Sequence, residues 1–197
     1  AHQVCMGSSA TPVPEAGQYT MLMDVGSDRI PGGVSCGTLM VSPSGSVRFT
    51  GTCSDGTKVT QSTALCKKSN WSLYLSLYSG GGALWAPITI TNGAWEALGS
   101  ADAFWSKPAQ SKARYYPEGF TNQAVISGWR YQRPVNGGNV LALSEGNVVL
   151  EGGSLSEPFT NTFALGAHNQ VTDIGQTRLK LKFNSFAGSF SGSCVQP

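Results

Sequence analysis

Alternating apolar and polar residues are the main pattern in this chain. Residues 71–78 alternate strictly, and one side of the alternation is formed by Trp71, Leu73, Leu75 and Leu77. A period of two places successive side chains on opposite faces of a β-strand, so this segment is predicted to be a strand with one buried face. No segment keeps a helical period over about eleven residues. The pattern therefore predicts a protein built from strands.

Similar stretches are separated by turn-forming residues such as Asp55-Gly56 and Gly80-Gly81-Gly82. The expected strands span residues 18–23, 36–42, 47–53, 57–65, 71–78, 83–91, 121–131, 140–144, 147–150, 160–165, 178–183 and 189–194. Residues 93–120 are aromatic but irregular, and no strand is predicted there. About 11–12 strands joined mostly by short turns indicate an all-β fold, either an antiparallel barrel or a two-sheet sandwich.

A five-residue pattern occurs twice. Residues 49–53 read Phe-Thr-Gly-Thr-Cys, and residues 190–194 read Phe-Ser-Gly-Ser-Cys. Each is the expected second strand of a hairpin, after an apolar stretch and a Ser/Gly turn. The repetition favours a single all-β domain at 16–197 built from related halves at about 16–120 and 121–197. Chance similarity between strands rich in Gly, Ser and Thr is the alternative.

The first of these hairpins suggests a disulfide. If its turn is centred on Ser44-Gly45, Cys36 lies directly opposite Cys53. Cys53 shares the inner face of its strand with Val47 and Phe49, so Cys36 is expected on that face as well. A cross-strand disulfide between Cys36 and Cys53 is therefore predicted, although directly paired strand positions often give strained geometry.

The other cysteines also bear on the cellular compartment. The chain has five, an odd number, and no Cys-x-x-Cys or Cys/His cluster that would suit a metal. Disulfides in an oxidising compartment are favoured over reduced, buried thiols. Cys5 and Cys194 lie near the two ends of the chain and form the second predicted pair. Cys66 is then left over, either for a bond between molecules or as a buried, inert thiol.

Composition narrows the class of protein. Charged residues make up 12% of the chain, about half of the usual ~25%, while Gly, Ser and Thr are abundant. This is typical of turn-rich β-structure outside the cell. The net charge of +2 is too small to indicate nucleic acid, and no apolar run approaches the length of a membrane span.

No catalytic signature accompanies the pattern. The only histidines are His2 and His168, and neither belongs to a nucleophile elbow or an HExxH motif. The sequence therefore predicts no enzyme, no catalytic residue, no metal site and no cofactor.

Four stretches together resemble a β-rich module of large secreted bacterial surface proteins. They read FTGTCSDGTKVTQS, WSLYLSLYSGGGALWAPITI, FWSKPAQSKARYYPEGF and FSGSC, and the similarity covers about residues 17–194. The resemblance implies an extracellular, adhesin-like, all-β module without enzymatic activity. The module usually continues past its second FSGS-like strand and has few cysteines. This chain departs from it in both respects.

The strand at 189–194 is therefore expected to leave a sheet edge whose backbone groups need a partner. We expect Phe190, Gly192 and Cys194 to form the acceptor edge. An N-terminal arm at 1–15 offers the donor strand, formed by His2, Gln3, Val4, Cys5 and Met6. Donation between molecules would give a polymer of identical chains, whereas an arm that folds back would close its own sheet.

A second hypothesis concerns the aromatic region 95–120. Trp95, Trp105, Tyr115 and Tyr116 are candidates for a platform that stacks on sugar rings, and core packing is the alternative. The sequence therefore predicts a secreted structural protein that assembles with copies of itself or mediates adhesion. The alternative is a carbohydrate-binding module for extracellular polysaccharide.

Overall fold

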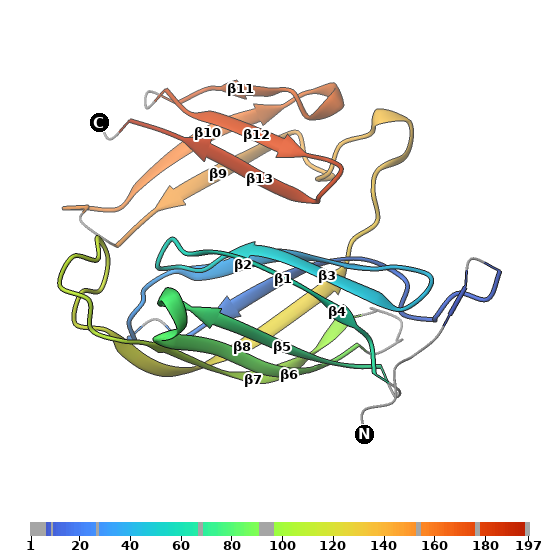
Figure 1. The fold of residues 1–197 in the computed structure, drawn as a ribbon. Helices are drawn as coiled ribbons and strands as arrows, with labels where there is room; N and C mark the ends of the chain where they lie inside the picture. Colours follow the sequence, from blue (N-terminus) through green and yellow to red (C-terminus); the bar gives the residue numbers. More distant parts are fainter. Residues whose placement is uncertain are drawn as a thin grey trace. The chain divides into compact units, whose positions relative to one another are not determined.

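The computed structural model describes residues 7–8, 10–26, 28–66, 69–90, 97–152, 155–175 and 178–195. The chain divides into two compact units, residues 1–131 and residues 132–197 (Figure 1). They are called the barrel unit and the C-terminal unit below. The division falls after residue 131 and not near residue 120, where the sequence pattern separated two halves. The reason is that the strand beginning at Phe120 pairs with strands of the barrel unit.

The barrel unit is a single antiparallel sheet. Its strands are β1 (Gly17–Asp24), β2 (Val34–Val41), β3 (Ser46–Thr52), β4 (Lys58–Ala64), β5 (Asn70–Leu77), β6 (Gly82–Thr89), β7 (Ala97–Lys107) and β8 (Phe120–Arg130). They follow the order β4-β3-β2-β1-β8-β7-β6-β5 and curl into a nearly closed barrel (Figure 1). The predicted all-β fold is thereby confirmed. Of the two architectures left open, barrel and two-sheet sandwich, this unit has the barrel, and the C-terminal unit adds smaller sheets.

The barrel has a seam between β4 and β5, its two end strands. One isolated bridge crosses it, where the Cys66 N–H donates to the Asn70 carbonyl at 2.8 Å. Further along, the side-chain amide of Gln61 donates to the Ser72 carbonyl at 3.3 Å. Side chains and one bridge therefore join β4 to β5 in place of a regular ladder.

The hairpin of β2 and β3 turns one residue earlier than predicted. Ser42 donates to the Ser46 carbonyl at 2.8 Å, and Gly45 has a φ of 85°, so three residues form the loop. This turn places Cys36 opposite Thr52, and Cys36 is exposed. The predicted inner face of β3 is confirmed, whereas the predicted inward position of Cys36 is wrong, because a one-residue shift moves a side chain to the other face.

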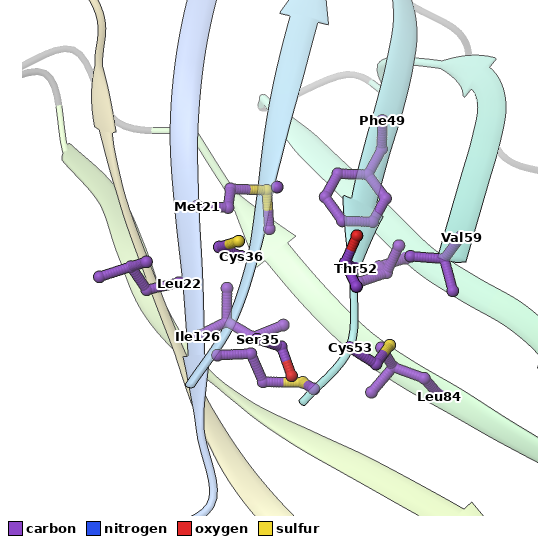
Figure 2. A pocket seen from close by; sticks show the side chains of 13 residues that line it. Met21, Leu22, Ser35, Cys36, Phe49, Thr52, Cys53, Val59, Leu84 and Ile126 are labelled. Atoms are coloured by element: carbon purple, nitrogen blue, oxygen red, sulfur yellow. The ribbon is translucent and has the colours of Figure 1, made fainter. Parts of the chain in front are cut away.

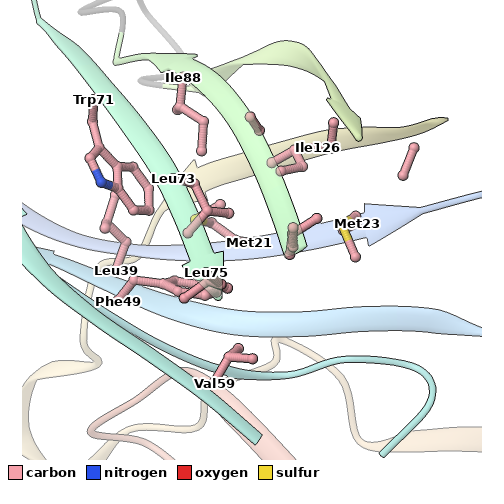
Figure 3. Close-up of a cluster of buried hydrophobic side chains, with 14 of the residues drawn as sticks. Met21, Met23, Leu39, Phe49, Val59, Trp71, Leu73, Leu75, Ile88 and Ile126 are labelled. Atoms are coloured by element: carbon pink, nitrogen blue, oxygen red, sulfur yellow. The ribbon is translucent and has the colours of Figure 1, made fainter. Parts of the chain in front are cut away.

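The barrel interior is filled by the inward residues of its alternating strands. β5 keeps the predicted alternation along its whole length, with Trp71 and Leu73 buried. Side chains from seven strands meet them (Figure 3). Figure 3 labels some of these residues from the other strands, namely Met21, Met23, Leu39, Phe49, Val59, Ile88 and Ile126. Burial of this apolar set is the main source of the unit's stability.

Two predictions about the barrel unit are corrected. Residues 93–120 are not wholly irregular, because they contain the 11-residue strand β7. The segment before Gly17 is not wholly a detached arm either. Val13 is buried and its N–H donates to the Pro43 carbonyl at 3.0 Å, and Glu15 is also buried. The described residues from 10 onward are therefore part of the barrel unit.

The C-terminal unit contains two small antiparallel sheets. One has the order β11-β10-β9, and the other is the hairpin β12-β13. The strands are β9 (Glu145–Leu150), β10 (Phe159–Leu165), β11 (Val171–Asp173), β12 (Lys180–Asn184) and β13 (Ser189–Ser193). Residues 140–144 form no strand, and β11 was not predicted. The hydrophobic core of the C-terminal unit is small, with Phe163, Leu165 and Leu179 buried.

The helical content is limited to three single 3₁₀ turns, η1 (Tyr78–Gly80), η2 (Val135–Gly137) and η3 (Ala167–Asn169), within the ranges given above. Over those same ranges, no helix has the length and apolar character needed to cross a membrane.

Candidate functional site

The barrel interior leaves almost no space for a ligand. The cavity among Met21, Phe49, Leu73, Leu84 and Ile126 has a volume of about 20 Å³ (Figure 2). This is close to the size of one water molecule and far below the several hundred Å³ of a typical small-molecule site. A sugar or another small-molecule ligand does not fit in this cavity.

The first candidate site is the edge formed by β13. This strand pairs with β12 in the register Lys180↔Ser193 to Asn184↔Ser189. Among the residues that the structure describes, β13 has no second ladder partner, and all five of its residues are exposed. One side of its backbone is therefore available for another strand.

Phe190 lies at this edge on the face that carries the small core. It is directly opposite Phe183, and the two ring centroids are 6.1 Å apart. Phe183 in turn lies 6.4 Å from the buried ring of Phe163. The three rings lead from the core to the edge, where Phe190 keeps 70% of its surface exposed. An incoming strand would therefore find both unpaired backbone and an apolar side chain.

The other two predicted acceptor residues, Gly192 and Cys194, are more closely packed than Phe190. Gly192 lies opposite Leu181, and a Cβ at Gly192 would come within 2.5 Å of the Lys180 carbonyl oxygen. Cys194 is half-buried against the small core and holds a free thiol. The predicted donor residues His2, Gln3, Val4, Cys5 and Met6 lie outside the described residues. The first described N–H, from Gly7, donates to the Ser44 carbonyl at 3.4 Å.

No disulfide joins the four cysteines within the described ranges. Cys36 is an exposed thiol and Cys53 a buried one, and Cys66 is half-buried at the barrel seam. Burial, with a further contribution from the charge of Asp55, raises the pKa of Cys53 to about 12. Because the thiolate is the reactive form, Cys53 is a poor nucleophile in this state.

The predicted sugar platform does not come together. Trp105 is fully buried, donates its indole N–H to the Tyr78 hydroxyl at 3.1 Å and packs edge-on against Phe120, with centroids 4.8 Å apart. The platform role predicted for Trp105 is therefore wrong. Tyr116 is half-buried, and its hydroxyl accepts from the Gly32 N–H at 2.9 Å. Tyr115 is exposed, and Trp95 lies outside the described residues.

Beside Trp105 is a buried polar network that the sequence did not reveal. A carboxylate oxygen of Asp55 accepts from the Tyr78 hydroxyl at 2.7 Å and lies 3.5 Å from the ammonium of Lys107. Burial alone would raise the pKa of Asp55, but hydrogen bonds from Tyr78 and Thr57 and the charge of Lys107 lower it overall. Burial, followed by the bond to Asp55, raises the pKa of Tyr78. The network joins the β3–β4 turn to β7 and η1.

Three exposed aromatic residues form a row on the outer face of the barrel. Tyr74 of β5 lies directly opposite Trp85 of β6, and Trp85 lies directly opposite Phe104 of β7. They are called the aromatic row below. The glycine turn between β5 and β6 could have revealed the first pair, because a short turn fixes the register of a hairpin. Phe104 could not be aligned, because its region was predicted to be irregular.

His168 lies at an open hollow of about 560 Å³ in the C-terminal unit. Its Nδ1 is 3.0 Å from the Gly137 carbonyl oxygen. The residues lining this hollow include Asn136, Asn139 and His168, but no Asp, Glu, Lys or Arg. The hollow therefore offers His168 no charged partner for proton transfer. Within the described residues, no group of three or more His, Cys, Asp or Glu could hold a metal ion.

Comparison with known proteins gives no match to this chain among protein-family models, curated proteins or solved structures.

Proposed function

We propose that this protein is an extracellular structural protein that assembles with copies of itself by adding a strand to the edge of β13. The observation that carries the proposal is the one-sided pairing of β13 together with the exposed ring of Phe190. Edge strands with exposed apolar side chains template pairing with another chain unless they are protected. In β13 neither a charged residue nor a proline provides that protection.

The N-terminal residues 2–6 are the proposed donor. Five residues match the length of β13, and pairing with it as a strand would place Val4 and Met6 on the same side. Main-chain hydrogen bonds to β13 supply affinity, and these two side chains pack against Phe190. Donation from one molecule to the next generates an open, head-to-tail polymer.

Location outside the cell rests on composition and on the resemblance to secreted bacterial surface modules. Low charge with many hydroxyl residues suits an exposed β-rich surface protein. Adhesion is the related role of an assembly of this kind.

The test is the size of the purified protein, measured by sedimentation velocity over a range of concentrations and by electron microscopy. We expect the wild-type protein to form oligomers that grow with concentration. Phe190→Lys should abolish them, because it places a charge where the added strand packs. Phe186→Lys is the matched control, since Phe186 is 62% exposed but lies in the β12–β13 turn. It should assemble normally.

Deletion of residues 1–6 tests the donor. It is preferable to deletion of 1–15, which would remove the buried Val13 and Glu15 and so damage the barrel. Loss of oligomers in this deletion supports the arm as donor, whereas unchanged oligomers assign donation to another segment. A wild-type protein that stays monomeric, or a Phe190→Lys variant that polymerises normally, overturns the proposal.

A further inference from the structure

The aromatic row on the outer face of the barrel calls for a functional explanation. Tyr74, Trp85 and Phe104 have exposed fractions of 56%, 47% and 43%. They occupy directly opposed positions on three adjacent strands. With a strand spacing of about 4.8 Å, the row extends about 10 Å across the sheet. Contiguous exposed apolar surface on a soluble protein marks an interaction site more often than chance exposure does.

The surroundings of the row are polar but almost uncharged. Outward-facing neighbours on the same strands include Ser72, Ser76 and Ser106, and Gln123 of β8 lies opposite Phe104. Asp102 is the one charged residue on the outward positions of β5, β6, β8 and residues 102–107 of β7, all within the described chain. The outer face of β3 and β4 differs, because it carries Arg48 and Lys58.

This chemistry selects among the possible occupants. Nucleic acid requires a basic groove beside the aromatic rings, and the described outward positions of β5, β6 and β7 carry no cation. Protein interfaces favour Arg and Met together with aromatic residues, and neither occurs at the outward positions of β5 and β6. Rings half-exposed in one line, with hydroxyl and amide groups beside them, fit a ligand that has flat apolar faces and neutral hydrogen-bonding edges. Sugar rings have both.

We infer that the aromatic row is a binding face for a neutral polysaccharide whose chain lies across β5, β6 and β7. The rings stack on successive sugar faces, and the serine hydroxyls and Gln123 bond to sugar hydroxyls. The row takes over the role first predicted for residues 95–120, and of that region it uses only Phe104. The inference does not depend on assembly through β13, which belongs to the other unit.

The experiment uses full-length protein carrying Phe190→Lys, so that assembly does not add avidity to binding. The probes are insoluble cellulose, insoluble chitin and a soluble mixed-linkage β-glucan, with polygalacturonate as the charged comparison. We expect retention on at least one neutral polysaccharide, little change between low and high salt, and weak retention on polygalacturonate. Trp85→Ala should weaken binding about tenfold or more, and Tyr74→Ala or Phe104→Ala several-fold.

Trp129→Ala is the matched control. Trp129 is 46% exposed on the same outer face, but it lies on β8 opposite Thr20 and Ala97, away from the row. It should bind as the parent does. Equal losses in Trp85→Ala and Trp129→Ala, or no retention on any of the three neutral polysaccharides, overturn the inference. If the Phe190→Lys parent still self-associates, binds none of the polysaccharides and loses self-association in Trp85→Ala, the face belongs to a second copy of the chain and the inference is overturned as well.

Discussion

The two copies of the Phe-x-Gly-x-Cys pattern lie in different environments although each forms the second strand of a hairpin. In β3 the phenylalanine is Phe49, which is 6% exposed, and in β13 it is Phe190, which is 70% exposed. β3 has a neighbour on each side, whereas β13 pairs with β12 alone among the described strands. The same local pattern is therefore buried in one unit and exposed in the other, so the local pattern alone does not decide its burial.

The residues opposite each copy add to the difference. In the first hairpin Gly51 faces Gly37, and a Cβ on Gly37 would lie 2.5 Å from the ring of Phe49. The ring therefore lies in the space that these two glycines leave free. In the second hairpin Gly192 faces Leu181, whose side chain occupies the corresponding space. The β13 pattern thus keeps its aromatic residue at the edge, where a partner could use it.

The largest expected effect is the loss of stability when Phe49 is replaced. Phe49→Ala should destabilise the barrel unit by about 3–5 kcal/mol, because it opens a cavity beside Trp71 in a packed core. Phe190→Ala should change stability by less than about 0.5 kcal/mol, as expected for an exposed site. Urea unfolding followed by tryptophan fluorescence reports on the barrel, since all five tryptophans precede residue 132. Far-ultraviolet circular dichroism includes the C-terminal unit. Equal losses in both variants would contradict the comparison.

Much of the fold could be predicted because alternation is strong where one face of a strand is buried. β5 was expected at 71–78 and is observed at Asn70–Leu77, and the barrel follows from many such strands joined by short turns. β7 could not be predicted, since its aromatic residues lie on both faces: Phe104 points outward and Trp105 inward. A single sequence also cannot specify which strands meet, so the buried role of Trp105 and the aromatic row were beyond it.

Some features of the candidate sites could be predicted and others could not, because a single sequence does not specify which strands meet. The hairpin of β12 and β13 was accessible to the sequence, because two apolar-patterned stretches flank a short turn. The position of Cys36 depended on whether the turn had two or three residues, which the Ser/Gly composition of the loop does not determine. The Asp55–Lys107 pair joins positions far apart in the chain, so only the folded barrel reveals it.

The next effect concerns Asp55, whose buried carboxylate stabilises the turn after β3. Asp55→Asn should cost the barrel about 2–3 kcal/mol at neutral pH, because it leaves the buried ammonium of Lys107 without a charged partner. The folded pKa of Asp55 is below its ordinary value. Its stabilisation is therefore complete above the unfolded pKa of about 3.9 and is lost as the pH falls through the folded value.

Melting temperatures measured between pH 7 and pH 2 check this effect. The wild-type barrel should lose more stability on acidification than Asp55→Asn, and the two should converge at the lowest pH. Parallel curves would show that Asp55 makes no pH-dependent contribution. Glu118→Gln is a suitable control, since Glu118 is an exposed carboxylate of the same unit. Its melting temperature at neutral pH should match that of the wild-type protein.

A smaller effect is expected at the two glycines of the pattern. A Cβ on Gly51 would lie 2.7 Å from the Cys36 carbonyl oxygen, and one on Gly192 would lie 2.5 Å from that of Lys180. Gly51→Ala should cost about 1–3 kcal/mol, because β3 is held on both sides and cannot move away. Gly192→Ala should cost less, because β13 can shift toward its open side. A larger loss for Gly192→Ala would show that β13 is held as firmly as β3.

The smallest effect is expected at the cysteines, where reactivity rather than stability distinguishes the two copies. Under reducing conditions at pH 8, iodoacetamide should modify exposed Cys36 quickly and half-buried Cys194 more slowly. It should leave buried Cys53 unmodified, because the thiol of Cys53 has a pKa of about 12 and remains protonated. Peptide mass spectrometry after timed labelling measures the three rates.

If the β13 edge receives a strand, modification of Cys194 should slow as the protein concentration rises, while that of Cys36 stays constant. If the labelling rate of Cys194 does not depend on protein concentration, no added strand covers this end of β13. The β13 copy of the pattern would then stay exposed at every concentration, unlike the copy in β3.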